Sequence, residues 1–416
     1  MKFVISLALA ACVSFTCAQQ GPQRCTSMRV RRNAATLSQQ DWQSIANVLS
    51  RMQNDGWISR FGESHDRVFS RVHGNTCFFP FHRRYVLEFE NIARSYDPNF
   101  VVPYWDATES FRNPAADRIL SSNGLGSNGQ GSDSCLTNGI QGNAQMTYPN
   151  QHCMRRIFDN GNSINPWYAP EIISSYIQTD TSLASFRENI EYSIHGAVHL
   201  GLGGEMNTGY AAHDFSFMVH HANLDRLWWN WQNTHNSFLM YDGTGSNGPA
   251  SLSDRIPEDS SVPLNGDNVE SVMVLGYGNV CYTYDSGPGA PQSYPSGGSG
   301  SRQQNGTDAN NGNQVPSSSS NIESRRRESE GIQNSLDSNA VNRFFPGFGG
   351  SMSRPLRRRG SEKKTSECGG PIPFPPRLTP AWIKMHGYDP NRVESAHKNA
   401  CEIVEILNNS TYSSPY

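Results

Sequence analysis

The chain has 416 residues and a formal net charge of −3, which gives no electrostatic reason to expect a nucleic-acid or anionic-membrane partner. Its length alone suggests two to three domains of about 150 residues each. Only 36% of the residues are hydrophobic, however, and 37 Gly and 24 Pro are present, so we expect one packed domain and a remainder without a core of its own.

The N-terminus has the three parts of a secretory signal peptide. Lys2 precedes an apolar run from Phe3 to Val13, and Thr16-Cys17-Ala18 supplies small residues before Gln19. We predict that residues 1–18 are removed on export. No later stretch approaches the roughly 18 consecutive apolar residues that a membrane span needs. The sequence therefore predicts a secreted protein with no membrane partner.

Helical periodicity recurs four times between about residues 25 and 284. Ser38 and Asp41 form a capping-box pattern ahead of a helix that ends near Asp55. Three further helices are expected from Pro80 to before Asp97, over about 182–200 and over about 217–232. Residues 121–150 read as a Gly/Ser/Asn-rich loop, and strand signals are short and few. We therefore expect a mainly α fold, with a four-helix-bundle core, long loops and few short strands.

The composition changes abruptly after Tyr284. Residues 285–367 are rich in Ser, Gly, Asn and Arg, so they are expected to form a disordered linker between a domain at 19–284 and a short segment at 368–416. Arg325–Arg327 and Arg357–Arg359 are basic clusters that either remain solvated or are cut by a processing protease. The last segment contains one expected helix and needs a disulfide to be stable. We do not expect the chain after Tyr284 to form a folded domain over the one that precedes it; the alternative is that Phe344-Phe345 acts as a plug.

Seven cysteines remain after the signal peptide. In an oxidising compartment this number suggests three disulfides and one unpaired thiol, although the sequence alone leaves the connectivity open. Proximity favours Cys135–Cys153 and Cys368–Cys401, and Cys25–Cys281 would then close the intervening segment and leave Cys77 single. Three N-x-[ST] sequons are candidate glycosylation sites: Asn305, Asn408 and Asn409.

Histidines are placed unevenly along the chain. His65, His73 and His82 lie close together, His195 and His199 are four residues apart, and His220 and His221 are adjacent. A separation of four puts two imidazoles on one helical face, where both reach one metal ion. Imidazoles without thiolates or clustered carboxylates favour copper ahead of zinc, nickel or iron. The predicted helices also lack the Glu-x-x-His pairs of a helical di-iron site, so the sequence predicts a dinuclear copper centre.

Most of these histidines belong to longer motifs, namely His73–Glu90, Pro103–Asp106, His195–His199 and His220–Trp228, followed by Tyr282–Tyr284. Together the motifs resemble those of the tyrosinase family, which comprises tyrosinases, catechol oxidases and molluscan-type haemocyanins. The resemblance implies that one copper ion is bound by His65, His73 and His82, and the second by His195, His199 and His221. Helical geometry alone leaves the choice between His220 and His221 open.

The resemblance also assigns residues around the ligands. His220 has a supporting role, Phe78 and Phe217 pack around the ligands, and Gly196 and Leu200 are candidates for the substrate pocket. Asp225, four residues after His221, either holds the other nitrogen of that imidazole or pairs with a nearby Arg.

The resemblance implies an activity, namely the oxidation of a small catechol to an o-quinone by dioxygen at two copper ions. Melanin biosynthesis is one process in which the resemblance places this reaction. Hydroxylation of monophenols also needs a base that removes the phenol proton. The asparagine that some members place directly after the first histidine of the second site is Gly196 here, which leaves Glu191 as the candidate base. We therefore expect a catechol oxidase with at most weak monophenol hydroxylation. The alternative is a haemocyanin-like carrier that binds dioxygen reversibly without turnover.

Overall fold

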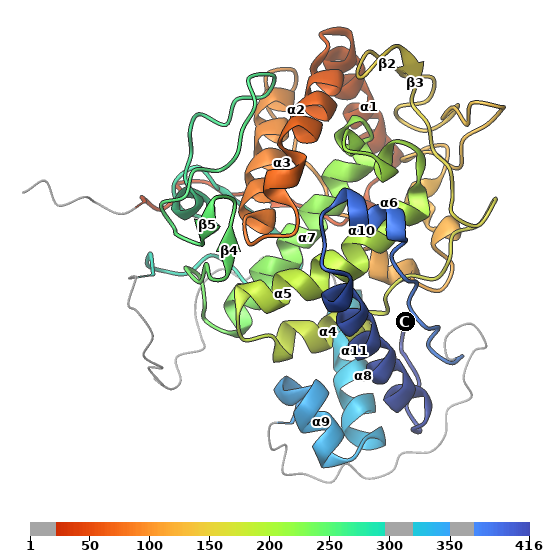
Figure 1. Cartoon of the computed structure of the whole chain (residues 1–416), viewed down its shortest axis with the longest axis vertical. Coiled ribbons are helices and arrows are strands. Elements are labelled where there is room, and N and C mark those ends of the chain that lie inside the picture. Colours follow the sequence, from red (N-terminus) through yellow and green to blue (C-terminus); the bar gives the residue numbers. More distant parts are fainter. Residues whose placement is uncertain (1–21, 296–318, 350–369) are drawn as a thin grey trace, which may run out of the picture.

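The computed structural model describes residues 22–295, 319–349 and 370–416. The predicted signal peptide, Asn305, Cys368 and Arg357–Arg359 lie outside these ranges. Helices dominate the described residues and the strands are short, which confirms the mainly α fold class (Figure 1). In the same part of the chain, no helix combines the length and the apolar character that crossing a membrane requires.

The N-terminal part contains seven helices among the described residues: α1 (Gln39–Asn54), α2 (Trp57–Val72), α3 (Phe78–Arg94), α4 (Pro170–Thr179), α5 (Leu183–Ile190), α6 (Gly196–Leu202) and α7 (Phe215–Thr234). The later helices are α8 (Ser319–Ser335), α9 (Ser338–Phe344), α10 (Pro380–Met385) and α11 (Pro390–Asn408). Strand β1 (Arg29–Arg31) pairs in parallel with β6 (Tyr282–Tyr284). The antiparallel pairs are β2 (Gln145–Met146) with β3 (His152–Cys153), and β4 (Thr244–Gly245) with β5 (Gly248–Pro249).

Helix α2 is one of the elements that the sequence interpretation missed, and it carries His65. Its buried side chains include Ile58, Phe61, His65 and Val68, which recur at three- and four-residue spacing and so lie on one face. Helices α2, α3, α6 and α7 lie together at the centre of the molecule (Figure 1). Helix α1, which begins at the predicted Ser38–Asp41 capping box, packs outside them against α2 and α3.

The helix expected over 182–200 is interrupted. Between α5 and α6, Glu191–His195 form a π-helical turn, in which Ser193 leaves the helical region with φ −119° and ψ −106°. The Ser193 hydroxyl donates to the carbonyl of Asn189. A π-bulge adds one residue to the helix and therefore turns the following residues by about 100° relative to the preceding ones. This turn sets the direction in which His195 faces the core.

Two of the three predicted disulfides are present. Cys25 pairs with Cys281, and Cys135 pairs with Cys153. The first joins the chain just before β1 to the chain just before β6, and the second ties the long 121–150 loop to β3. Cys77 is a buried free thiol, as expected. The Cys368–Cys401 pairing stays a prediction because Cys368 lies outside the described residues.

A buried carboxylate, that of Asp225, links α7 to α3 and β6 by hydrogen bonds. Asp225 accepts hydrogen bonds from Arg83 Nε at 2.5 Å, Tyr282 Oη at 2.6 Å and Tyr284 Oη at 2.5 Å. Arg31 Nη1 lies 3.5 Å from the same carboxylate. Both tyrosines of the Tyr-x-Tyr motif therefore act through Asp225, which links three segments that are distant in sequence.

Replacing Asp225 with alanine is expected to lower the free energy of unfolding by about 3–5 kcal/mol, because Arg83 would stay buried without its partner. Urea unfolding followed by circular dichroism measures this loss. The control is Arg67→Ala, which removes a pair with Glu63 in which the arginine side chain is 53% exposed; that change should cost less than about 1 kcal/mol. Equal losses in the two variants would contradict the role given to Asp225.

The prediction that 285–367 is a disordered linker is wrong for residues 319–349. Helices α8 and α9 form there, and Ile332, Val341, Phe344 and Phe345 are buried in the main core beside α4. The apolar residues of this segment are few, but four of them are buried in the core, which the low average hydrophobicity of 285–367 did not indicate. The basic cluster Arg325–Arg327 lies exposed on α8.

Two buried carboxyl groups, Glu328 on α8 and Glu171 on α4, are bonded to tyrosines of the C-terminal segment. Tyr416 Oη donates to Glu328 Oε2 at 2.9 Å, and Tyr412 Oη donates to Glu171 Oε1 at 2.8 Å. Burial, with the charge of Glu171, raises the pKa of Glu328 to about 7, and burial also raises the pKa of Glu171. Arg325 and Arg112 act on these groups in the opposite direction. Glu328 therefore binds a proton more tightly when α8 is packed against the rest of the protein than when α8 is detached.

Docking of α8 is expected to be strongest in acid. A raised carboxyl pKa contributes stability below the ordinary value near 4.5, and this contribution is lost as the pH rises to about 7, by at most about 3 kcal/mol. Hydrogen exchange of α8, corrected for intrinsic rates, should be faster at pH 8 than at pH 5. The variant Glu328→Gln stays neutral and should keep its protection at pH 8. The same pH dependence in both proteins would refute this explanation.

Candidate metal centre

The structure brings the six predicted histidines together as two buried triads, one formed by His65, His73 and His82 and the other by His195, His199 and His221. Within each triad, the nitrogen atoms that could bind a metal all lie within 4.8 Å of one another. The triads face each other: the His82 and His221 rings stack with centroids 4.0 Å apart, and those of His73 and His195 are 5.8 Å apart. This arrangement suits two metal ions side by side.

Backbone carbonyls orient most of these rings. Nδ1 lies 2.6 Å from Gly209 O in His65, 3.0 Å from Phe69 O in His73, 2.7 Å from Phe78 O in His82 and 2.6 Å from Met206 O in His199. Because a carbonyl only accepts, each Nδ1 carries the proton and each Nε2 keeps its lone pair. The Nε2 atoms of His199 and His221 lie 3.4 Å apart. The Nε2 lone pairs of His65 and His82 face each other, also at 3.4 Å. A cation between them removes the repulsion.

The protein environment keeps these imidazoles neutral. Burial lowers the pKa of His65 to about 4 and the pKa of His199 to about 3, and it lowers the pKa of the other four ligand candidates as well. Neutral imidazole is the form that binds metal. Nε2 of His195 is buried and has no hydrogen-bond partner within the described part of the chain. An all-nitrogen donor set of this kind fits copper.

The predicted aromatic neighbours pack against the ligands. The Phe217 ring lies 4.1 Å from His221 and 4.8 Å from His65, and the Phe78 ring lies 4.7 Å from His82 and 4.9 Å from His195. The sequence left open whether His220 or His221 belongs to the second triad. In the structure His221 completes this triad, and His220 lies beside it. The His220 ring stacks 6.0 Å from that of His195.

The expectation that Asp225 holds His221 is wrong. Among the described residues, Nδ1 of His221 has no hydrogen-bond partner, while the oxygens of Asp225 are taken by Arg83, Tyr282 and Tyr284. The alternative of an arginine partner is correct, although the pair is buried and not on the surface.

Glu191, the candidate base, is fully buried and bonded on both oxygens. Its Oε1 accepts from Gly74 N and from Tyr388 Oη, each at 2.8 Å, and its Oε2 accepts from Arg187 Nη1 at 2.8 Å. Burial raises the pKa of Glu191, and Arg187 opposes that effect. The carboxylate therefore joins the turn after His73 to α5 and to the C-terminal segment.

The C-terminal segment 370–416 covers the two triads, contrary to expectation. The Trp382 ring lies 5.3 Å from that of His199, and the His386 ring lies 4.9 Å from that of His73. Trp382 and His386 stack on each other at 3.9 Å, and they are only 2% and 4% exposed. In Figure 1, α10 lies next to α6 and α7. We call Leu378–Tyr388 the cover.

The two candidate pocket residues lie under this cover. A Cβ atom added at Gly196 would be 2.4 Å from Leu378 Cδ2 and 3.2 Å from Trp382 Nε1, so the absence of a side chain lets the cover approach α6. Leu200 packs against the same apolar cluster. It also lines a cavity of about 750 Å³ between α6 and the C-terminal segment, which Phe374 and Pro376 border on the other side.

The sequence interpretation overlooked Trp382 and His386. A local signal was present: Thr379 caps α10 with Pro380 at its first position, and Leu378 and Trp382 are four residues apart. Periodicity predicts a short amphipathic helix from this pattern, but it does not say which surface the helix covers.

Comparison with known proteins agrees with this geometry. Residues 39–234 match the common central domain of tyrosinase. The protein named tyrosinase ustQ, from Aspergillus flavus, is 30% identical over 299 residues, which are 62% of this chain and 80% of that protein. A tyrosinase from Streptomyces antibioticus is 28% identical over 246 residues, 53% of this chain and 88% of that one. A variant of the polyphenol oxidase from Thermothelomyces thermophila has the same fold, with a TM-score of 0.55 at 20% identity over 63% of this chain and 90% of that one.

Proposed function

The chain belongs to the tyrosinase family, and on this premise we propose that it is a secreted copper oxidase that converts catechols to o-quinones with dioxygen. Members of the family that are enzymes are oxidoreductases. The observation that carries the proposal is the pair of facing histidine triads with their Nε2 lone pairs directed inward. Carrier function without turnover is the alternative.

The first triad would hold one copper ion and the second triad the other. When bound, the two ions supply the capacity to accept the two electrons that a catechol gives up and to pass them to dioxygen. The protein supplies the orientation: carbonyls fix the imidazole rings, and Phe78 and Phe217 pack against them.

We further propose that catechols are better substrates than monophenols. Gly196 offers no side-chain amide, and Glu191 already accepts three hydrogen bonds. A monophenol must lose its proton before it can be oxidised, and both oxygens of Glu191, the candidate base, already accept hydrogen bonds from the protein. Weak hydroxylation is therefore expected, and only once Tyr388 has left Glu191.

Export and processing are part of the proposal. The Cys25–Cys281 and Cys135–Cys153 disulfides suit an oxidising compartment. Cleavage within Arg357–Arg359 would separate the cover from the preceding chain, whereas Arg325–Arg327 lies within α8. Glycosylation is expected at the exposed Asn409 before Asn408, whose side-chain amide bonds both to N and to O of Ile372. Melanin biosynthesis is one process that such an enzyme could serve.

The test is copper content together with oxygen uptake on a catechol and on a monophenol, before and after limited proteolysis. We expect two copper ions per chain and catechol turnover that rises on proteolysis and exceeds monophenol turnover. An absorption change that follows oxygen pressure reversibly, with no turnover even after proteolysis, would favour the carrier. Failure to bind copper at all would refute both.

A further inference from the structure

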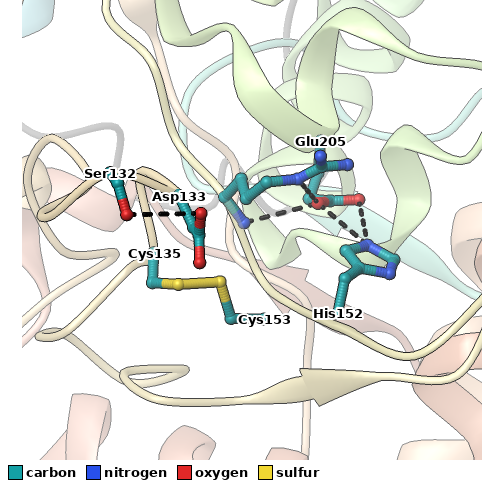
Figure 2. Close-up of a disulfide and its surroundings, with 7 residues drawn as sticks. Ser132, Asp133, Cys135, His152, Cys153 and Glu205 are labelled. Carbon is teal, nitrogen blue, oxygen red and sulfur yellow. Dashed lines mark hydrogen bonds and ion pairs between the residues drawn. A yellow bond between two sulfur atoms is a disulfide. The ribbon is translucent and has the colours of Figure 1, made fainter.

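A third cluster of metal-binding side chains lies outside the two triads. His152 comes from β3, Glu205 from the 3₁₀ turn Gly204–Asn207, and His213 from the 3₁₀ turn Ala211–His213. One ligand atom from each lies within 4.8 Å of the other two. Figure 2 shows the His152 ring directed at the Glu205 carboxylate. We propose that these three residues form a separate site for a divalent cation of the zinc type.

The distances fit a shared ion better than direct hydrogen bonds. His152 Nε2 lies 3.1 Å and 3.3 Å from the two oxygens of Glu205, and His213 Nδ1 lies 3.3 Å from Oε2. Charge-assisted N–H···O bonds are usually about 2.7–2.9 Å long. In tetrahedral zinc sites with bonds of about 2.0–2.1 Å, neighbouring ligand atoms are about 3.3–3.4 Å apart. The observed separations lie close to this value.

The tautomer of His152 supports the same conclusion. Its Nδ1 lies 2.7 Å from Asn150 O, so that nitrogen carries a proton. In the neutral ring, Nε2 then directs a lone pair at a carboxylate, a repulsion that a bound cation removes and that only a second proton on the ring would otherwise remove. Two histidines and one glutamate form a known zinc donor set, in which a fourth position stays open.

Arg155 holds one of the three proposed ligands in place, and the partial exposure of His152 gives a cation access to the site. Arg155 Nε donates to Glu205 Oε1 at 3.2 Å, and the Arg155 backbone N lies 3.3 Å from the same oxygen, so the carboxylate is held in place. The positive charge of Arg155 opposes a cation, but its side chain is 36% exposed and therefore partly screened. The side chain of His152 is 13% exposed, whereas those of Glu205 and His213 are fully buried. The ion would thus enter past His152.

The position of the cluster gives it a structural task. The chain from Glu205 to His213 contains the carbonyls of Met206 and Gly209, which orient His199 and His65, one histidine of each triad. An ion bound at both ends of this stretch would fix it to β3, and β3 is itself tied by the Cys135–Cys153 disulfide (Figure 2). The site would therefore hold the loop that positions ligands in both copper sites.

The experiment is metal analysis of the full chain after loading with copper and then zinc, with anomalous scattering at the zinc and copper edges to locate each ion. We expect one zinc ion at this cluster in addition to the two copper ions. The variant His152→Ala should weaken zinc binding at least about 100-fold and leave the copper content at two. The matched control His235→Ala removes a half-buried histidine outside all three clusters, and it should leave zinc binding unchanged.

Three results would overturn the proposal. These are an empty cluster in the zinc-loaded wild-type protein, zinc retained equally by His152→Ala, and copper found at this position in preference to zinc. The first and the third need no variant, so a failure of His152→Ala to fold leaves the proposal testable. Hydrogen exchange provides a second readout, because zinc should slow the exchange of residues 205–213 in the wild-type protein only.

Discussion

Replacing His199 with alanine is expected to reduce catechol oxidation at least about 1,000-fold, equivalent to about 4 kcal/mol in the barrier. The reason is loss of the second copper ion, since two imidazoles would remain where three converge. The measured copper content should fall from two ions to one per chain. Oxygen uptake measured on the same preparation links the loss of activity to the loss of the ion.

The informative comparison for this variant is between the two adjacent histidines of α7. His221→Ala should also lose one copper ion, whereas His220→Ala should keep both, because the His220 ring lies beside the second triad and is not one of its members. The two residues are similarly buried, so a general effect of cavity formation would act on both. Catechol oxidation retained in His199→Ala, or an equal copper loss at His220 and His221, would refute the ligand assignment.

The metal centre could be predicted from the sequence where local spacing decides the geometry. His195 and His199 are one helical turn apart, and the structure places both in the second triad despite the π-helical turn before α6. His65 was assigned from the resemblance alone, and α2, the helix that carries it, was not predicted; α2 contains Gly62, and glycine weakens a helical signal. The structure shows why glycine is present: a Cβ atom at residue 62 would lie 2.0 Å from the imidazole of His213.

Contacts between distant segments could not be predicted in the same way. The helical wheel placed Asp225 on the face of His221, but the partners of Asp225 come from α3 and β6, and only the folded chain brings them close. The cover is a similar case. The composition of 285–367 indicated no core, and the segment 368–416 was expected to need a disulfide for stability, yet Trp382 and Leu378 fit over Gly196. Composition gives the amount of apolar surface in a segment. Which other part of the protein this surface packs against depends on the whole fold.

Loosening the cover is expected to raise activity on catechol between about 10-fold and 1,000-fold in the variant Trp382→Ala. The Trp382 side chain is 2% exposed and packs between His199 and His386. Truncating a buried tryptophan costs about 3–5 kcal/mol, and the variant loses this from the docked state alone, which increases the fraction of molecules with an accessible centre. The rise is limited by the activity of the fully open enzyme. Steady-state oxygen uptake on a small catechol measures it.

Proteolysis and a second variant separate this explanation from a direct role of Trp382 in binding substrate. If Trp382 only blocks entry, cutting the chain between α9 and α10 and removing the C-terminal segment should give the same high activity in wild type and variant. Met385→Ala is the control, because that side chain belongs to the same segment but is 37% exposed and does not border the cavity beside Leu200, so docking and activity should not change. Unchanged or lower activity in Trp382→Ala, with two copper ions still bound, would contradict blocking. The activity of this chain would then depend on Trp382 as a binding surface, and removing the segment should lower turnover instead of raising it.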